Sequence, residues 1–125
     1  MMAGLILGRE GVRSIVSISG PAHAGRYGGS VFKEGDDPRL SSAPMELVDP
    51  QAPPLLATHS RNDNLVKPEE SIAMVQRMRE VGCSAEIYLY DGPGDQHGIW
   101  RDDRVPLRLF QHIEDAIKAF LLKTL

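Results

Sequence analysis

Two polar loops in the sequence carry an acid and a base with the chemistry of a catalytic pair. Residues 59–66 contain Asp63, and residues 92–98 contain His97. A histidine can shuttle a proton when a carboxylate fixes its tautomer and stabilises its cation. The same residue types also have plainer uses, because an aspartate in a turn often hydrogen-bonds the backbone and a loop histidine is often only solvated. Spacing alone leaves both interpretations open.

Three apolar segments precede or flank these loops and predict strands. Residues 13–19 alternate apolar and small polar side chains, residues 55–58 form a short buried run that ends at His59, and residues 85–90 alternate again. The carboxyl ends of neighbouring parallel strands meet at one edge of a sheet, where functional groups gather in the loops. The pattern therefore predicts that Asp63 and His97 lie at the same edge.

Apolar residues at helical spacing predict three helices between and around the strands. Proline at a helix start and glycine just beyond its end are the expected boundary signals. The predicted helices cover residues 2–10 with Gly8 as a possible stop, residues 68–81 with Gly82 as the end, and residues 106–125. Residues 20–52 have no sustained period and predict a long loop or lid-like insertion, in which residues 38–47 could form a short helix.

Alternating strands and helices favour parallel pairing and an α/β layer fold. We therefore expect a three-layer parallel sheet of about three strands and three or four helices in one domain, residues 1–125. The chain has 125 residues with a net charge of −3, which gives no basic surface for nucleic acid. No apolar run is long enough to span a membrane, and the N-terminal residues lack the basic start of a signal peptide. The single Cys83 fits a reducing compartment, so we expect a cytoplasmic protein.

The segment from Pro53 to Val66 resembles a known enzyme family. It reads PPLLATHSRNDNLV, similar to the α/β-hydrolase pattern P-P-hydrophobics-H-G-x-x-D-x-x-V, with Ser60 where the family usually has glycine. The helix, strand and glycine-rich loop that follow keep the order of the prolyl-oligopeptidase-like and carboxylesterase-like branch, which includes dienelactone hydrolase and acetyl-esterase. The resemblance covers residues 2–124. It implies that Asp63 is the triad acid and His97 the triad base of a serine esterase or peptidase.

The nucleophile of this family is the serine of a G-x-S-x-G turn, and the sequence does not contain that motif. Ser30 follows two glycines but precedes valine and phenylalanine. Ser19 lies at a strand end but precedes glycine and proline, so it is a minor alternative nucleophile. The resemblance places the missing turn just before Met1. We therefore expect a C-terminal part of a hydrolase, without nucleophile or oxyanion hole.

Two functions from different classes follow from this pattern. The chain is either the acid- and base-bearing part of a serine hydrolase or a catalytically silent, truncated module that binds or self-associates. The chain alone is expected to be inactive in both cases, because acyl transfer needs a serine within reach of the histidine. The strand at residues 13–19 would have an unpaired edge, which predicts a homo-oligomer formed through it.

The remaining polar residues divide into possible pocket residues and structural ones. His23 and Trp100 are candidates to line a substrate pocket, although solvation of His23 and packing of Trp100 under the last helix are alternatives. His59 is expected to hydrogen-bond across the base of its loop, His112 to lie at the surface, and Cys83 to be unreactive. The histidines show no ligand spacing with Asp, Glu or Cys, so we predict no metal and no cofactor.

Overall fold

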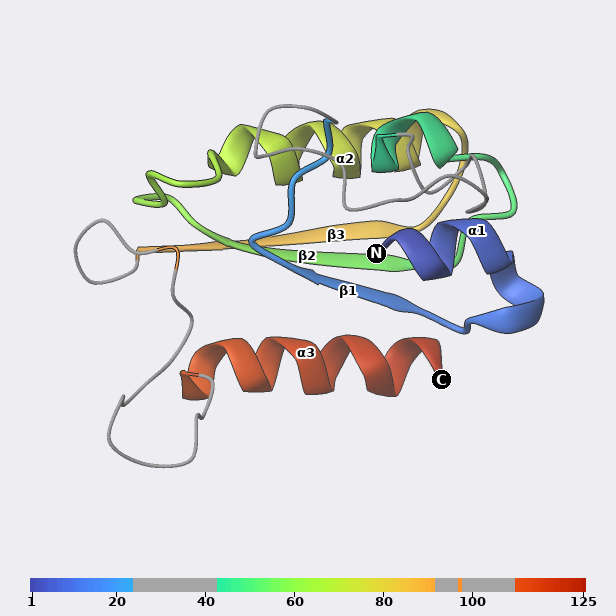
Figure 1. Cartoon of the computed structure of the whole chain (residues 1–125). Coiled ribbons are helices and arrows are strands. Elements are labelled where there is room, and N and C mark those ends of the chain that lie inside the picture. The colour runs from blue at the N-terminus through green and yellow to red at the C-terminus, as the bar shows by residue number, and fades with distance from the viewer. Residues whose placement is uncertain (24–42, 92–96, 98–109) are drawn as a thin grey trace.

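A computed structural model describes residues 1–23, 43–91, 97 and 110–125 of the chain (Figure 1). These residues form three α-helices, one 3-10 helix and three strands. In chain order they are α1 (Met2–Gly11), β1 (Ile15–Ile18), the 3-10 helix η2 (Pro44–Leu47), β2 (Leu55–Ser60), α2 (Pro68–Glu80), β3 (Ala85–Tyr90) and α3 (Gln111–Thr124).

The three strands form one parallel sheet in the order β1-β2-β3. Leu55 in the central strand is level with Ile15 on one side and Ala85 on the other. The prediction of an α/β fold with about three parallel strands is confirmed. The carboxyl ends of all three strands therefore lie at the same end of the sheet, on the left of Figure 1.

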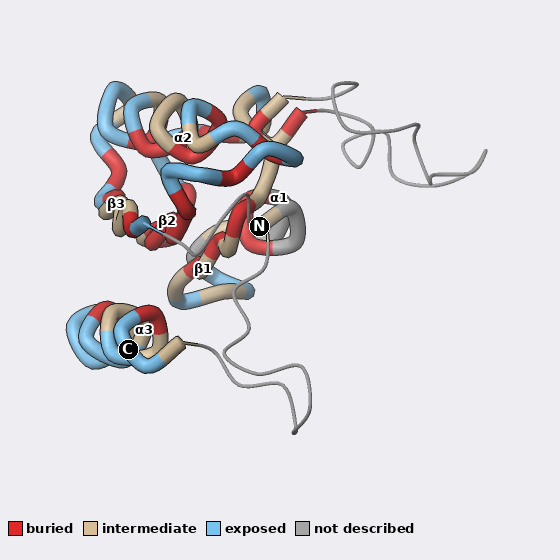
Figure 2. The backbone as a smooth tube through the Cα atoms, turned by 90° about the vertical axis from the view of Figure 1, so that its left-hand side faces the viewer, coloured by how far each residue is buried: buried red, intermediate tan, exposed pale blue. Residues whose placement is uncertain are grey.

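Helices cover both faces of the sheet, as Figures 1 and 2 show. One face packs against α2, with α1 and η2 beside it, and the opposite face packs against α3. The first core contains, among others, Leu5, Ile15, Leu55, Ala57, Met74, Val75 and Met78. The second is smaller and contains Tyr90 and Ile113, with Ile18, Tyr88, Phe110 and Ile117 packed against it.

Helix α2 shows how local sequence signals position the candidate site. It begins at Pro68, whose fixed φ suits the first helical position, and two glutamates follow in the first turn near the positive end of the helix dipole. The chain leaves the helix through Gly82, whose φ of 84° favours glycine. The predicted helix over residues 68–81 is thus confirmed to within one residue.

Several predicted boundaries are wrong in detail. β2 continues through His59 to Ser60, because its neighbour β3 offers pairing partners along the whole length. β1 covers only Ile15–Ile18 of the predicted 13–19. Gly8 does not end α1 but bends it, with a φ of 62°, and the helix resumes as far as Gly11.

Other predictions are only partly covered by the described residues. The possible helix at 38–47 is observed as the 3-10 helix η2, whereas most of the predicted loop at 20–52 lies outside the described residues. The last helix is described from Gln111, and the predicted start near Pro106 lies outside the described part. Of the helices described, none is both long and apolar enough to cross a bilayer.

Candidate active site

Asp63 lies in the turn that follows β2, and its two carboxylate oxygens have different partners. Its side chain is fully buried. Oδ1 accepts hydrogen bonds from the backbone N–H groups of Leu65 and Val66, both at 2.9 Å. Oδ2 lies 2.8 Å from Nδ1 of His97. One oxygen of Asp63 therefore holds its own turn, and the other contacts the imidazole of His97.

His97 comes from the loop after β3, 34 residues further along the chain. Its side chain is 41% exposed. Because the carboxylate accepts only, Nδ1–H is the donor, and the neutral ring then has a lone pair on Nε2. Within the described residues, Nε2 of His97 has no hydrogen-bond partner. This tautomer and exposure are those that a general base requires.

The surroundings of Asp63 keep it ionised. Burial raises the pKa of its carboxyl group, but the N–H of Val66, the hydrogen bond and charge of His97 and the N–H of Leu65 together lower the pKa below its usual value. The negative charge also acts on Tyr90 at the end of β3. Burial, followed by the charge of Asp63, raises the pKa of the Tyr90 phenol, so this hydroxyl stays protonated.

His59 is the second imidazole beside Asp63. The ring is fully buried, with Nδ1 2.7 Å from Oγ of Ser71 and Nε2 2.8 Å from the carbonyl oxygen of Val66. Nε2 also lies 3.2 Å from Oδ2 of Asp63. The expectation of a hydrogen-bonded structural residue at the base of the loop is confirmed.

His23 forms a second carboxylate–imidazole pair that the sequence did not reveal. Its Nδ1 lies 2.9 Å from Oε2 of Glu70, and the side chain is 38% exposed. The same oxygen accepts the backbone N–H groups of Ala22 at 2.9 Å and His23 at 3.0 Å. Burial raises the pKa of Glu70, but these donors outweigh it and the pKa is lowered. His23 is thus anchored to α2 rather than merely solvated. The sequence around His23 contains no signal that would identify Glu70 as its partner.

Of two further candidate site residues from the sequence, the structure describes Ser19 but not Trp100. Ser19, the minor alternative nucleophile, is 4% exposed and adopts a left-handed φ of 49°. In the described part of the chain, no hydrogen bond joins its hydroxyl to His97. Trp100, the other candidate pocket residue, lies outside the described residues.

His112 is exposed as expected, yet it is not isolated. Its ring is stacked on Phe110 at 5.7 Å and meets Tyr90 edge-on at 5.3 Å, and the Tyr88 hydroxyl lies 3.2 Å from its Nδ1. Two tyrosines at alternate positions of a predicted strand were the available signal for this cluster. Cys83 is buried, and its thiol donates to the carbonyl of Asp49 at 3.3 Å, as fits an unreactive cysteine.

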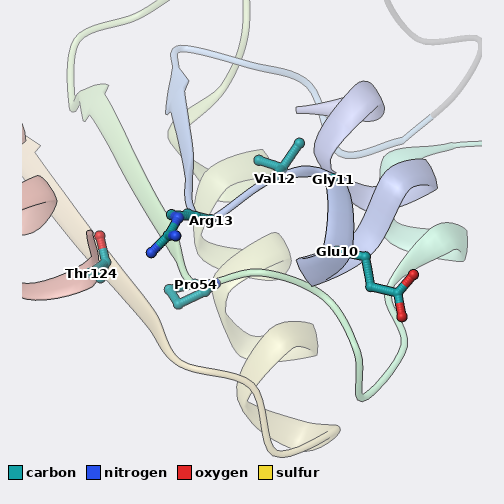
Figure 3. Close-up of a pocket in the computed structure, with 6 residues that line it drawn as sticks. All are labelled: Glu10, Gly11, Val12, Arg13, Pro54 and Thr124. Atoms are coloured by element: carbon teal, nitrogen blue, oxygen red, sulfur yellow. The ribbon is translucent and has the colours of Figure 1, made fainter.

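Two grooves lie close to β1, one at its amino end and one along its length. One of about 530 Å³ lies at the amino ends of the strands, away from Asp63, and is lined by Glu10, Gly11, Val12, Arg13, Pro54 and Thr124 (Figure 3). The other, of about 430 Å³, runs beside β1 and is lined by Met1, Val16, Ser17, Ile18, Gly20, Pro21 and Pro44. Among the described residues, no three His, Cys, Asp or Glu side chains are grouped closely enough to hold a metal ion.

Comparison with known proteins places this architecture among esterase structures. No protein-family model and no curated protein matches the sequence. The thermophilic esterase Est2 of the planctomycete Thermogutta terrifontis superposes with a TM-score of 0.63 at 18% identity, over 90% of this chain and 42% of the esterase. The form of esterase 2 phosphoramylated by tabun gives a TM-score of 0.56 at 24% identity, over 71% of this chain and 33% of that one.

A third similar structure is the acetyl ester-xyloside bifunctional hydrolase of Caldicellulosiruptor lactoaceticus. It gives a TM-score of 0.52 at 19% identity and covers 66% of this chain and 33% of the hydrolase. At these identities the likeness establishes the fold, so the described sheet and helices form part of an α/β-hydrolase fold. The chain spans less than half the length of the esterases that it matches.

Proposed function

We propose that this chain carries the acid and the base of a serine hydrolase of the prolyl-oligopeptidase-like or carboxylesterase-like branch. The observation that carries the proposal is the 2.8 Å contact between the buried carboxylate of Asp63 and Nδ1 of the half-exposed His97. This contact leaves Nε2 as the proton acceptor. The esterase-like fold supports acyl transfer as the reaction, with a small ester or peptide as substrate.

In the proposed reaction, a serine Oγ attacks the carbonyl carbon while its proton moves to Nε2 of His97. Asp63 remains ionised and stabilises the imidazolium, which then returns the proton to the leaving group. Water then attacks the acyl-serine, gives its proton to Nε2 of His97 and releases the acid, and the serine regains its proton. The sequence contains no G-x-S-x-G turn, so the nucleophile and the oxyanion hole come from outside these 125 residues. His23 and Trp100 would line the substrate pocket, in a cytoplasmic enzyme that needs no cofactor.

Hydrolysis of p-nitrophenyl acetate by the 125-residue chain tests the proposed base. The chain is expected to lack serine-dependent turnover, but neutral imidazole attacks this activated ester without a serine. We therefore expect a slow residual hydrolysis that falls in His97→Ala and in Asp63→Asn. His112→Ala is the control, because its ring is also exposed but contacts Tyr88 and Phe110 rather than a carboxylate. Equal rates in wild type and His97→Ala would overturn the proposal.

A fluorophosphonate probe tests where the nucleophile lies. Such probes lose fluoride as they form a phosphorus–oxygen bond with an activated serine. The similar Thermogutta terrifontis esterase 2 is phosphoramylated by another organophosphorus compound, tabun. We expect no covalent adduct on this chain by intact-mass spectrometry. An adduct on any serine that disappears in His97→Ala would show that this chain supplies its own nucleophile.

The free edge of β1 favours a second candidate function, a silent module that self-associates. Among the described strands, β1 pairs only with β2. The groove beside β1 is lined by uncharged side chains and by the amino-terminal residue Met1, so no like-charged side chains oppose the approach of two copies there. Unpaired N–H and C=O groups along such an edge are a template for pairing with another strand. The partner proposed is a second copy of this chain.

Sedimentation velocity over a range of concentrations tests this pairing. We expect a dimer that Val16→Lys disrupts, because the substitution places a charge in the groove beside β1. Leu122→Lys is the control, since Leu122 is an exposed apolar residue on α3, away from this edge. A monomer at all concentrations, or equal effects of the two substitutions, would exclude association through β1.

A further inference from the structure

The buried imidazole of His59 connects three parts of the molecule around the acid loop, by which we mean residues 61–67 between β2 and α2, which include Asp63. The residue belongs to β2, its Nδ1 contacts Ser71 in the first turn of α2, and its Nε2 contacts the carbonyl of Val66 at the end of the loop. Nε2 also lies 3.2 Å from Oδ2 of Asp63. Neither the acid nor the base role in the proposed reaction requires this ring.

The partners of His59 determine where its proton lies. The carbonyl oxygen of Val66 and the carboxylate oxygen of Asp63 only accept hydrogen bonds, so Nε2 must carry a proton. In the neutral ring Nδ1 is then an acceptor, and the hydroxyl of Ser71 donates to it. Both nitrogens of this fully buried ring are therefore satisfied, as burial requires.

We propose that His59 is a positioning residue for the Asp63–His97 pair, a role that rests on the proposed function of that pair. Val66 is held twice, through its carbonyl by His59 and through its N–H by Oδ1 of Asp63. The acid loop is thereby closed around the carboxylate. The Nε2–H of His59 also faces Oδ2, the oxygen that accepts the proton of His97.

This arrangement predicts that the donor at Nε2, rather than the bulk of the ring, keeps Asp63 oriented toward His97. Gln and Asn separate the two properties, because the Gln amide nitrogen reaches the place of Nε2 whereas the Asn amide reaches only the place of Nδ1. His59→Gln therefore retains the donor to the loop, and His59→Asn retains the partner of Ser71 but loses that donor.

NMR of the ¹⁵N-labelled 125-residue chain reads the orientation directly. In His59→Asn we expect the Nδ1 proton of His97 to exchange with water about tenfold faster, as follows when its closed state loses about 1.4 kcal/mol. The carboxyl titration of Asp63 should move up toward its usual range, because the loop N–H groups no longer hold the charged form. In His59→Gln both signals should stay within about twofold of wild type, since the donor that closes the loop is kept.

The possible outcomes decide between positioning and simple packing. If Asn and Gln destabilise the chain equally and leave the His97 proton unchanged, His59 is only a packed core residue and the proposal is wrong. If neither variant folds, Ser71→Ala provides the test, because it releases one side of the ring: faster exchange at His97 supports the proposal and unchanged exchange overturns it. An unreactive His97 whose NMR signals behave as expected would overturn the proposed function and leave the positioning role intact.

Discussion

The Asp63–His97 and Glu70–His23 pairs have nearly the same contacts but different connections to the chain. Each carboxylate is buried, accepts two backbone N–H groups and bonds Nδ1 of a partly exposed imidazole. For Glu70, the imidazole and one of the N–H groups belong to the same residue, His23. For Asp63, the N–H groups come from its own loop and the imidazole from a loop after another strand.

We call the Glu70–His23 contacts a clamp, because they fix main chain as well as a ring. Asp63 instead orients only the ring of His97, which is the arrangement that the proposed reaction needs. Glu70 binds main chain and ring of His23 through one oxygen, so it fixes the segment after β1 to α2. Asp63 uses one oxygen to shape its own loop and the other to orient a base that arrives independently. A carboxylate–histidine contact alone therefore does not identify a catalytic pair, and the source of the remaining donors is the better guide.

The largest expected effect is on stability, from removal of the clamp. Glu70→Ala leaves the buried N–H groups of Ala22 and His23 without their acceptor, which should lower the free energy of unfolding by about 3 kcal/mol. Urea denaturation followed by circular dichroism measures the change. Glu69→Ala is the control, because Glu69 is exposed in the same helical turn. Similar losses in both variants would show that Glu70 acts only through the helix dipole.

Asp63→Asn should lower the free energy of unfolding less than Glu70→Ala does, but it should lower ester hydrolysis strongly. The amide keeps an oxygen for Leu65 and Val66, so we expect a loss of about 2 kcal/mol, while its N–H₂ cannot accept the proton of His97. Hydrolysis of p-nitrophenyl acetate that depends on His97 should fall to background. Glu70→Gln makes the same chemical change in the other pair and should leave that rate intact. Loss of the rate in both variants would remove the distinction between the pairs.

Acid should destabilise the chain through both carboxylates. Their pKa values are lowered in the folded state from ordinary values of 3.8 for Asp63 and 4.5 for Glu70. A lowered pKa contributes stability above the ordinary value, and the contribution is lost as the pH falls through the folded value. The free energy of unfolding should therefore decline below about pH 4.5. The decline should be shallower in the double variant Asp63→Asn/Glu70→Gln, and an unchanged slope would contradict the shifts.

The two histidines should differ little in stability. His97→Ala and His23→Ala each remove one hydrogen bond from a partly exposed ring, so we expect about 1 kcal/mol or less from either. Thermal denaturation compares them under identical conditions. His97→Ala should in addition reduce ester hydrolysis, because it removes the proton acceptor of the proposed reaction. A loss of several kcal/mol in His97→Ala would indicate that this residue, too, is mainly structural.

The smallest effect is expected for an exposed carboxylate, which provides the baseline for both pairs. Glu86 on β3 contacts Nζ of Lys123 on α3 at 2.8 and 3.0 Å, and the two side chains are 44% and 58% exposed. Glu86→Gln should change the free energy of unfolding by less than about 1 kcal/mol, because water screens such pairs. Urea denaturation that showed a change as large as that of Glu70→Ala would mean that burial does not set the ranking.

The sequence predicted the Asp63–His97 pair better than the Glu70–His23 pair, because the order of strands and loops alone brings the first pair together. Two strands followed by polar loops placed Asp63 and His97 at one edge of a parallel sheet, and the structure brings them into contact. Glu70 lies close after Pro68 near a helix start, and this local position gives no sign of a distant partner. Its pairing with His23 depends on how the segment after β1 crosses α2, 47 residues away in sequence, and no local pattern encodes that crossing.

Boundaries followed the same division between local and distant causes. The bounds of α2 were predicted to within one residue, because Pro68 and Gly82 determine the backbone conformation at their own positions. β2 extended past His59 because β3 supplied hydrogen-bond partners, which only the assembled sheet could provide. His112 was correctly expected at the surface, but its contacts with Tyr88, Tyr90 and Phe110 required α3 to be docked on the sheet.

Local sequence patterns were sufficient to predict the order of the elements, the parallel α/β class and the presence of an acid and a base in loops at the same end of the sheet. These follow from hydrophobic period and from proline and glycine, which act over a few residues. Three features required the assembled fold: which oxygen of Asp63 faces His97, the contacts of His59 that close the acid loop, and the binding of His23 by Glu70. Those choices depend on buried groups finding partners across the chain, because an unpaired polar group is costly once water is excluded.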